Sequence, residues 1–394
     1  MTPQRILVIG HTYTAPVNRL KWDFVAEDPR FEVLLLTPRK WRNYLTVSDN
    51  VASRHAHGYR TLFVEARLGP WFGWHHVLYL IPRLGAIIRD FQPQLIYCEQ
   101  EPICLVSGQT ALLAGDIPVV FFSWENVNRR DLKYRLLSPI RAWCHRKSAF
   151  MVAGSRGAAE AIRNQGYRKP IYITPILGVS EELFFPAPAG GGQNPSGPFT
   201  IGYLGRFADQ KGVDTLLEAV SILTPSIPWR LVLVGDGPAR QAYEDLVRRE
   251  GLAHRVEFHP AVPHEEVPSF LRRLQVLVLP SKTTPTWKEQ FGHVLIEAMA
   301  SGVPVVGSSS GEIPATIGEA GLVFREGEAL DLQRQLQILY ENTDLRGELQ
   351  RRGLARVRDF FTDQRIANNT MAIFERALNL EPRTPNTLQV DSGC

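Results

Sequence analysis

Short apolar runs alternate with amphipathic stretches along most of this 394-residue chain. Runs at residues 6–9 and 119–122 are apolar throughout, which is typical of strands buried on both faces of a sheet. Stretches such as residues 131–147, which lie between the runs at 119–122 and 150–152, have the apolar spacing of a helix. Strands that alternate with helices indicate βαβ units, which build parallel sheets. The pattern therefore predicts an α/β protein.

The alternation occurs twice, once in each half of the chain. A chain of this length is too long for one ordinary core, so two domains are expected. We predict two doubly wound, Rossmann-like domains that face a central cleft, with ligands bound beyond the carboxyl ends of the strands. The expected strands are residues 6–9, 33–36, 95–97, 119–122, 150–152, 199–204, 231–234, 256–258, 276–279 and 303–306. The expected helices are residues 17–26, 76–90, 131–147, 156–165, 212–223, 239–250, 266–273, 291–301, 328–342, 344–358 and 363–379.

A stretch rich in Gly and Pro, residues 186–198, contains no large apolar side chain and favours a linker. The chain after residue 380 is short and polar, which favours disorder. The predicted organisation is an N-terminal domain at 1–185, the linker at 186–198, a C-terminal domain at 199–360, a helix within 361–380 that packs back on the N-terminal domain, and a disordered tail at 381–394.

Two carboxylates lie near the start of an expected helix in the second half of the chain, at Glu289 and Glu297. The segments Gly205-Arg206-Phe207 and Gln210-Lys211-Gly212, earlier in the same half, supply two cations. Carboxylates can hold sugar hydroxyls, and Arg and Lys can hold a diphosphate. The combination predicts a site for a nucleotide sugar.

Four motifs in one order carry a family resemblance: Gly205-Arg206 with Lys211-Gly212, Val234-Gly235-Asp236-Gly237-Pro238, Glu289 with Glu297, and Gly302-Val303-Pro304. Together they resemble the retaining glycosyltransferases of family 4, which have the GT-B fold. The resemblance is strong over residues 199–325 and extends to the rest of the chain by architecture. Any one of these motifs alone would be weak.

The resemblance implies a role for each residue on the donor side. Arg206, after Gly205, and Lys211 would bind the diphosphate, often without a metal in this family, so we expect neither a metal site nor a cofactor besides the nucleotide sugar. Glu297 would bind the ribose and Glu289 the transferred sugar. The base is not readable from the sequence, and a UDP- or GDP-sugar is expected. Backbone N–H groups at the start of the expected helix would help bind phosphate, at Phe291, Gly292, His293 and Val294.

The first half departs from the family pattern. Gly10 stands where a family residue lets the donor phosphates approach, but the second Gly of that loop is absent. Many members have a His after the strand that is here 119–122, where this chain has Ser123-Trp124-Glu125-Asn126. Glu125 is therefore either a catalytic group or a residue that binds the acceptor or structures the loop, and Trp124 and Asn126 join it as acceptor-side candidates.

Two further carboxylates, Glu99 and Glu101, follow the expected strand 95–97. They either bind acceptor hydroxyls or form the acidic first turn of a helix. We include both among the acceptor-side candidates.

The net charge is divided unevenly between the two halves. Residues 1–198 hold 23 Lys and Arg against 15 Asp and Glu, and residues 199–394 hold 21 against 25. Basic and aromatic residues gather at 129–147 and 70–76, which favours peripheral contact with a membrane surface, although a core-facing helix with one solvated side would look similar. The acidic second half and the lack of a known motif argue against nucleic acid.

The sequence therefore predicts an enzyme, a retaining glycosyltransferase that moves a sugar from a nucleotide-diphosphate donor to a saccharide or lipid-linked acceptor in polysaccharide or glycoconjugate synthesis. Glu289, Glu125, Arg206 and Lys211 are its expected catalytic residues. Four irregularly spaced cysteines favour the cytoplasm, at the inner face of the membrane if membrane contact occurs. Two alternatives stay open: a non-catalytic glycosyltransferase-like binding subunit, or a sugar-nucleotide epimerase or phosphorylase on the same scaffold.

Overall fold

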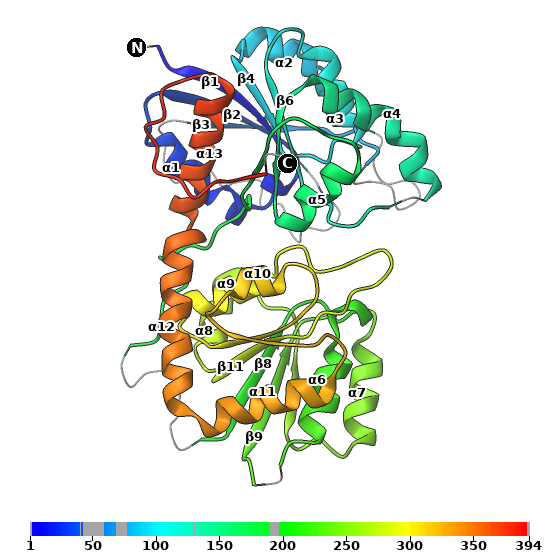
Figure 1. The fold of residues 1–394 in the computed structure, drawn as a ribbon, viewed down its shortest axis with the longest axis vertical. Coiled ribbons are helices and arrows are strands. Elements are labelled where there is room, and N and C mark those ends of the chain that lie inside the picture. Colours follow the sequence, from blue (N-terminus) through cyan, green and yellow to red (C-terminus); the bar gives the residue numbers. More distant parts are fainter. Residues whose placement is uncertain are drawn as a thin grey trace. The chain divides into compact units, whose positions relative to one another are not determined.

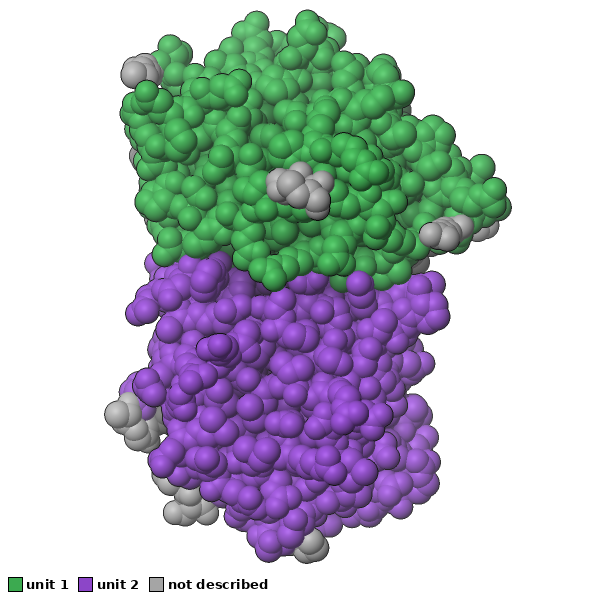
Figure 2. Space-filling view, in the orientation of Figure 1, with its two compact units in different colours: residues 1–178, 363–394 green, residues 179–362 purple. Residues whose placement is uncertain are grey.

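A computed structural model describes residues 2–39, 41, 59–67, 77–129, 131–188, 197–224 and 226–391. The chain divides into two compact units (Figure 2), unit 1 with residues 1–178 and 363–394, and unit 2 with residues 179–362. Each unit contains a largely or wholly parallel sheet, with helices connecting the strands (Figure 1). The predicted α/β class, with two doubly wound domains, is confirmed.

Unit 1 contains a sheet with the strand order β14-β7-β6-β5-β4-β1-β2-β3. All neighbouring strands are parallel except β14, which pairs antiparallel with β7. The strands are β1 (Gln4–Ile9), β2 (Phe31–Pro38), β3 (Tyr59–Val64), β4 (Leu95–Cys98), β5 (Val119–Ser123), β6 (Ser148–Ala153), β7 (Ile171–Ile173) and β14 (Gln389–Asp391). The helices are η1 (Thr12–Thr14), η2 (Pro16–Arg19), α1 (Leu20–Ala26), α2 (Leu84–Phe91), α3 (Leu105–Leu113), α4 (Leu132–Lys147), α5 (Arg156–Asn164) and α13 (Asp363–Ala377).

Unit 2 contains a fully parallel sheet with the order β10-β9-β8-β11-β12-β13. Its strands are β8 (Phe199–Leu204), β9 (Trp229–Val234), β10 (Val256–His259), β11 (Val276–Leu279), β12 (Val305–Ser308) and β13 (Leu322–Phe324). Its helices are η4 (Asp209–Lys211), α6 (Val213–Ser221), α7 (Arg240–Arg249), η5 (His264–Glu266), α8 (Val267–Leu271), α9 (His293–Ala300), α10 (Ile313–Ile317), α11 (Ala329–Glu341) and α12 (Thr343–Phe360).

The central strands are buried along nearly their whole length, as their continuous apolar sequences predict. Helix starts are fixed by local side chains: Ser155 accepts a hydrogen bond from the Ala158 N–H at α5, and Asn342 accepts one from the Leu345 N–H at α12. The helix expected over 76–90 begins only at Leu84, because Pro82 and Arg83, the latter with φ of 61°, interrupt the backbone before it.

The two chain crossings between the units differ from the predicted boundaries. We expected a linker at 186–198, most of which lies outside the described residues, but unit 2 already begins at residue 179. Val179 and Phe184 are buried in the core of unit 2, and the Val179 N–H donates to the Phe361 carbonyl at 2.8 Å. The chain passes from unit 1 to unit 2 after residue 178 and returns to unit 1 after residue 362. Val179, just after the first passage, forms a parallel bridge with Thr362, just before the second.

The C-terminal segment belongs to unit 1. Within it, α13 packs against α1, and the rings of Trp22 and Phe374 lie 6.5 Å apart. We expected disorder from residue 381 onwards, yet residues 389–391 form β14 on the edge of the sheet. Polar side chains hold this segment, and hydropathy does not reveal them: Arg163 pairs with Asp391 at 2.8 Å, and Asn369 accepts from the Thr387 N–H at 2.8 Å.

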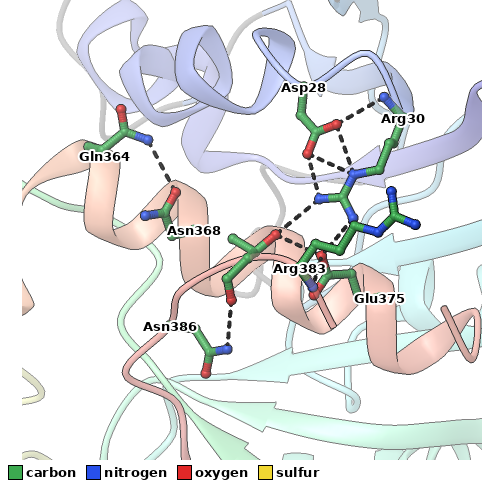
Figure 3. A network of polar contacts seen from close by, with 8 residues as sticks. Asp28, Arg30, Gln364, Asn368, Glu375, Arg383 and Asn386 are labelled. Carbon is green, nitrogen blue, oxygen red and sulfur yellow. Dashed lines mark hydrogen bonds and ion pairs between the residues drawn. The ribbon is translucent and has the colours of Figure 1, made fainter. Parts of the chain in front are cut away.

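Glu375 is the centre of this polar network (Figure 3). Glu375 is 1% exposed, and its carboxylate accepts hydrogen bonds from the Arg30 guanidinium at 2.9 Å and the Thr384 hydroxyl at 2.7 Å. It also accepts one from the Arg383 N–H at 3.2 Å, while Arg30 is held in turn by Asp28. The network thus joins the loop before β2, helix α13 and the segment that leads to β14.

Replacing Glu375 should loosen the C-terminal segment. We expect Glu375→Ala to lower the free energy of unfolding of unit 1 by roughly 2–4 kcal/mol, because three donors lose a buried acceptor. Urea unfolding followed by circular dichroism would measure the loss, and hydrogen exchange at residues 378–391 would locate it. Glu381→Ala is the matched control, since Glu381 pairs with Arg383 on the surface at 3.6 Å and should have little effect. Equal stability of the two variants would contradict the network's role.

Candidate functional site

Each sheet reverses its strand order at one place, between β1 and β4 in unit 1 and between β8 and β11 in unit 2. In doubly wound sheets, ligands bind beyond the carboxyl ends of the strands at such a reversal. Gly205 and Arg206 follow β8, and Ser281 follows β11. Gly10 follows β1, and Glu99 follows β4. Gly10, Glu99, Gly205 and Arg206 therefore lie at the two reversals, whereas Trp124, Glu125 and Asn126 follow the neighbouring strand β5.

In unit 2, a lysine and a carboxylate meet at the reversal. The Lys211 Nζ lies 2.7 Å from the Glu289 Oε2, and the Ser281 hydroxyl donates to the same oxygen at 2.7 Å. The Lys211 Nζ also lies 4.8 Å from the centroid of the Trp287 ring. Glu289 is buried, while about a quarter of the Lys211 side chain is exposed. An anion that reached Lys211 would find a cation already positioned by two neighbours.

The backbone around Glu289 is fixed by the turn that follows β12. The Glu289 carbonyl accepts from the Glu312 N–H at 3.1 Å, and a Cβ on Gly311, which has φ of 54°, would lie 2.0 Å from that carbonyl oxygen. The Thr316 hydroxyl donates to the Phe291 carbonyl at 2.7 Å. Gly311 is thus required by the close approach of two loops, and together these contacts hold the loop that carries Glu289.

Arg206 differs from Lys211 in its surroundings. Its side chain is exposed and forms no ion pair or side-chain hydrogen bond with the residues that the structure describes. Its carbonyl accepts from the Tyr203 hydroxyl at 2.8 Å. A Cβ on Gly235 would lie 1.9 Å from the Gly205 carbonyl oxygen, so the loops after β8 and β9 approach this closely only because residue 235 is glycine. The guanidinium is accordingly available for a ligand.

Helix α9 begins at His293, two residues later than expected. Gly292, with φ of 78°, precedes it as the N-cap, and Phe291 lies outside the helix. The first helical N–H groups therefore come from His293 and Val294. Glu297 lies one turn further on and is 5% exposed.

Glu297 accepts hydrogen bonds from two imidazoles. The His264 Nε2 lies 3.0 Å and the His293 Nδ1 lies 3.1 Å from its Oε1. Burial raises the pKa of the Glu297 carboxyl, but the two imidazoles outweigh burial and lower the pKa to about 2. Glu297 is therefore ionised throughout the neutral pH range.

In unit 1, Glu99 lies in the core. Its Oε1 lies 2.8 Å from the Lys21 Nζ, and its Oε2 accepts from the Tyr13 hydroxyl. Both side chains of the ion pair are almost completely buried. A Cβ on Gly10 would lie 2.6 Å from the Tyr13 ring, so the ring itself requires glycine at this position. Glu99 thus has both oxygens engaged inside the protein, and this geometry favours a structural role for it.

Glu101 holds the loop after β5 by three hydrogen bonds. Its Oε2 accepts from the Ser123 hydroxyl at 2.7 Å, and its Oε1 accepts from the N–H groups of Trp124 at 2.6 Å and Glu125 at 3.0 Å. Burial and the nearby charge of Glu125 raise the pKa of the Glu101 carboxyl to about 7, against the opposite effect of these hydrogen bonds. Glu101 therefore positions the residues that we expected on the acceptor side.

The loop residues themselves differ in their surroundings. The Glu125 Oε2 accepts from the Tyr134 hydroxyl at 2.9 Å and lies 3.5 Å from the Arg129 Nε. Trp124 packs edge-on against Phe122 with ring centroids 5.1 Å apart, and Asn126 is buried. Glu125 is thus held at a partly buried position beside an arginine and a tyrosine.

The predicted basic and aromatic surface is described only in part. Residues 70–76 lie outside the described residues, whereas residues 132–147 form α4. Leu132 and Leu136 of α4 are 68% and 64% exposed, and Trp143 is also exposed. No helix in the described part of the chain is long and apolar enough to cross a membrane. Among those same residues, no group of three or more His, Cys, Asp or Glu side chains is placed to hold a metal ion.

Several residues beside the predicted ones escaped sequence reasoning. Ser281, Trp287 and His264 contact Lys211, Glu289 or Glu297 directly, and Tyr134 contacts Glu125. Ser281 lies two residues after the expected strand 276–279, a position that could have identified it. The other three belong to no motif: Trp287 and Tyr134 lie near Glu289 and Glu125 in the sequence, and His264 comes from a separate segment.

Comparison with known proteins identifies the family. Residues 27–175 match the model described as a glycosyl transferase 4-like domain, and residues 191–356 match the model described as glycosyl transferases group 1. With the fold and the similar proteins below, these matches show that the chain belongs to the glycosyltransferases of the GT-B fold.

Two relatives and one solved structure illustrate the similarity. The 2-deoxystreptamine glucosyltransferase of Streptomyces kanamyceticus is 32% identical over 185 residues, which cover 46% of each chain. The lipopolysaccharide core biosynthesis glycosyltransferase LpsE of Rhizobium meliloti is 30% identical over 226 residues, or 55% of this chain and 61% of LpsE. The matches thus span about half to three fifths of these relatives. The structure of Anabaena HepE in complex with UDP has a TM-score of 0.71 at 17% identity, covers 95% of this chain and 100% of HepE, and supports the fold.

The ionisation of Glu101 should make unit 1 less stable as pH rises. Its folded-state pKa of about 7 lies above the unfolded value of 4.5, so its contribution is full below pH 4.5 and is lost as pH rises through 7. We expect Glu101→Gln, which stays neutral, to lose less stability than the wild type between about pH 5 and pH 8. Urea midpoints across this range would test it. If the urea midpoints of the two proteins changed equally with pH, the raised pKa of Glu101 would be contradicted.

Proposed function

We propose that the protein is a retaining glycosyltransferase that transfers a sugar from a nucleoside-diphosphate sugar to a saccharide or lipid-linked acceptor. The observation that carries the proposal is the cluster of Lys211, Glu289 and Ser281 at the β8–β11 reversal. It combines a positioned cation with a buried carboxylate, the two groups that a sugar diphosphate requires. Glycosyltransferase relatives and the UDP complex of HepE support the same class of donor.

On the donor side, Arg206 and Lys211 neutralise the diphosphate as the bond to the sugar breaks. Charge develops on that leaving group, so cations that are already placed there lower the barrier. Lys211 exchanges part of its contact with Glu289 for phosphate oxygens, and Glu289 then accepts hydrogen bonds from the sugar hydroxyls. The ionised Glu297 accepts from the ribose, and the N–H groups of His293 and Val294 lie at the start of α9 for a phosphate.

On the acceptor side, Glu125 is our candidate for contact with the acceptor hydroxyl or with positive charge at the anomeric carbon. Glu101 holds its loop through the three hydrogen bonds already described. In a retaining reaction on one face of the sugar, the departing phosphate takes the acceptor proton. Glu125 therefore need not act as a base, and Trp124 offers an aromatic surface next to it.

Donor binding is the direct test. Calorimetry with UDP, GDP, ADP and dTDP should show selective binding that weakens by roughly ten- to a hundred-fold in Lys211→Ala and in Arg206→Ala, since each loses a charge-assisted contact. Glu289→Gln should lower the transfer rate by at least about a hundred-fold while retaining nucleotide binding. Arg248→Ala, on the exposed face of α7, is the control and should bind as the wild type does.

The outcomes separate the candidate functions. No nucleotide binding by a folded wild-type protein would favour the non-catalytic subunit. Selective binding with full transfer activity in Glu289→Gln would contradict the role of this residue. Conversion of the sugar nucleotide without any acceptor would favour an epimerase.

We further propose that α4 contacts an anionic membrane surface. Its exposed side presents Leu132, Leu136 and Trp143, and Arg135, Arg146 and Lys147 are exposed beside them. The helix contains no Asp or Glu, which suits a negatively charged bilayer. A lipid-linked acceptor would be reached from such a surface.

Removing the apolar side chains of α4 should weaken binding to anionic vesicles. We expect the triple variant Leu132→Ser, Leu136→Ser, Trp143→Ser to bind phosphatidylglycerol-containing vesicles at least about ten-fold more weakly than the wild type. Co-sedimentation would measure this, with pure phosphatidylcholine vesicles as the uncharged reference. Ile338→Ser removes an exposed apolar side chain from unit 2 and is the control. Wild-type binding by the triple variant would overturn the proposal.

A further inference from the structure

The carboxylate of Glu297 is fixed on one side only. Both imidazoles donate to Oε1, at 3.0 Å from His264 and 3.1 Å from His293. A carboxylate has about four acceptor positions on its two oxygens. Oε2 receives no hydrogen bond from any residue that the structure describes. One oxygen is therefore anchored, and the other is left for a ligand.

The two histidines come from separate segments, so their convergence is not a by-product of one helix. His293 is the first residue of α9, and the spacing of four residues places it over Glu297 on the same face. His264 comes from η5, where its ring lies edge-on to Phe184 with centroids 5.2 Å apart. About a third of each imidazole is exposed, whereas the Glu297 side chain is 7% exposed.

The arrangement also fixes the charge and the orientation of the carboxylate. A buried carboxylate without donors would take up a proton more readily and could then act as a donor itself. With two N–H donors on Oε1, the group stays an acceptor, and rotation about its last bond would break both hydrogen bonds. A hydroxyl that donates to Oε2 would therefore meet an acceptor already fixed in place.

We propose that His264 and His293 are positioning residues that fix Glu297 for a ribose hydroxyl and so set a preference for ribonucleotides over deoxyribonucleotides. The inference rests on the proposed donor site. A ribose offers two neighbouring hydroxyls as donors, whereas a 2′-deoxyribose offers one. Without the imidazoles, the Glu297 carboxylate can rotate or take up a proton. The removal of the 2′-hydroxyl from the nucleotide should then reduce the binding affinity less.

The test compares UDP with 2′-deoxy-UDP by calorimetry, or GDP with 2′-deoxy-GDP if the donor screen selects guanosine. We expect the wild type to bind the ribonucleotide roughly ten- to a hundred-fold more tightly. The double variant His264→Phe, His293→Phe keeps two aromatic rings beside Phe184 and Phe291 but removes both donors. In this variant, the affinities for the ribonucleotide and the 2′-deoxyribonucleotide should differ by no more than about three-fold. The same is expected of Glu297→Gln.

A second double variant provides the matched control. His264→Gln and His293→Asn each retain an N–H donor at the end of the side chain that corresponds to Nε2 or Nδ1. This variant should recover most of the wild-type ratio, which a purely structural role of the rings would not predict. Circular dichroism and melting temperatures would show that all variants fold.

The possible results are distinct. A full ribose preference in the folded His264→Phe, His293→Phe variant would overturn the inference while leaving the donor site intact. Binding of both nucleotides with equal affinity by the wild type would overturn it as well. Lack of any nucleotide binding by the wild type would overturn the proposed function, and this inference with it.

Discussion

The reversal of strand order in a parallel sheet is the constraint on which the candidate site depends. Parallel strands place all their carboxyl ends at one edge, and right-handed crossovers carry the helices to opposite faces on the two sides of the reversal. The loops after β8 and β11 therefore diverge and leave room for a ligand. Arg206 and Ser281 follow these two strands directly, and η4 and the loop before α9 bring Lys211 and Glu289 to the same edge. No single motif builds the site, because the sheet assembles it from four segments.

The candidate site in unit 2 pairs its charges within the protein. Lys211 and Glu289 neutralise each other, and two histidines keep Glu297 ionised. An isolated buried carboxylate is costly, so these partners stabilise the fold around each carboxylate. Unit 1 has a similar ion pair in its core, between Lys21 and Glu99. The two pairs differ in exposure: about a quarter of the Lys211 side chain is exposed, whereas the Lys21 pair is almost completely buried.

Much of the fold was predictable from the sequence, because strands buried on both faces consist of unbroken apolar runs. The strands β3, β7 and β13 were missed, because β3 mixes polar with apolar residues and the apolar runs of β7 and β13 are only three residues long. For the candidate site, the family motifs pointed to Arg206, Lys211, Glu289 and Glu297, and the structure places Lys211 in contact with Glu289. Glu99 was placed on the acceptor side because its position after β4 is visible in the sequence, whereas its partner Lys21 lies 78 residues away. The ordered segment before and within β14 was missed as well, since Glu375 and Asn369 hold it through a few polar contacts that hydropathy does not reveal.

Unit 1 is built from two separated stretches of chain, and this affects how the protein is made. The ribosome completes all of unit 2, residues 179–362, before it reaches α13 and β14. During that interval the nascent N-terminal sheet lacks the partner strand of β7 and the helix that covers α1. An unpaired strand edge and an uncovered apolar helix face invite association with other chains. The second unit, which is contiguous, can fold during synthesis, while the first must wait with its β7 edge open until the polypeptide returns to it.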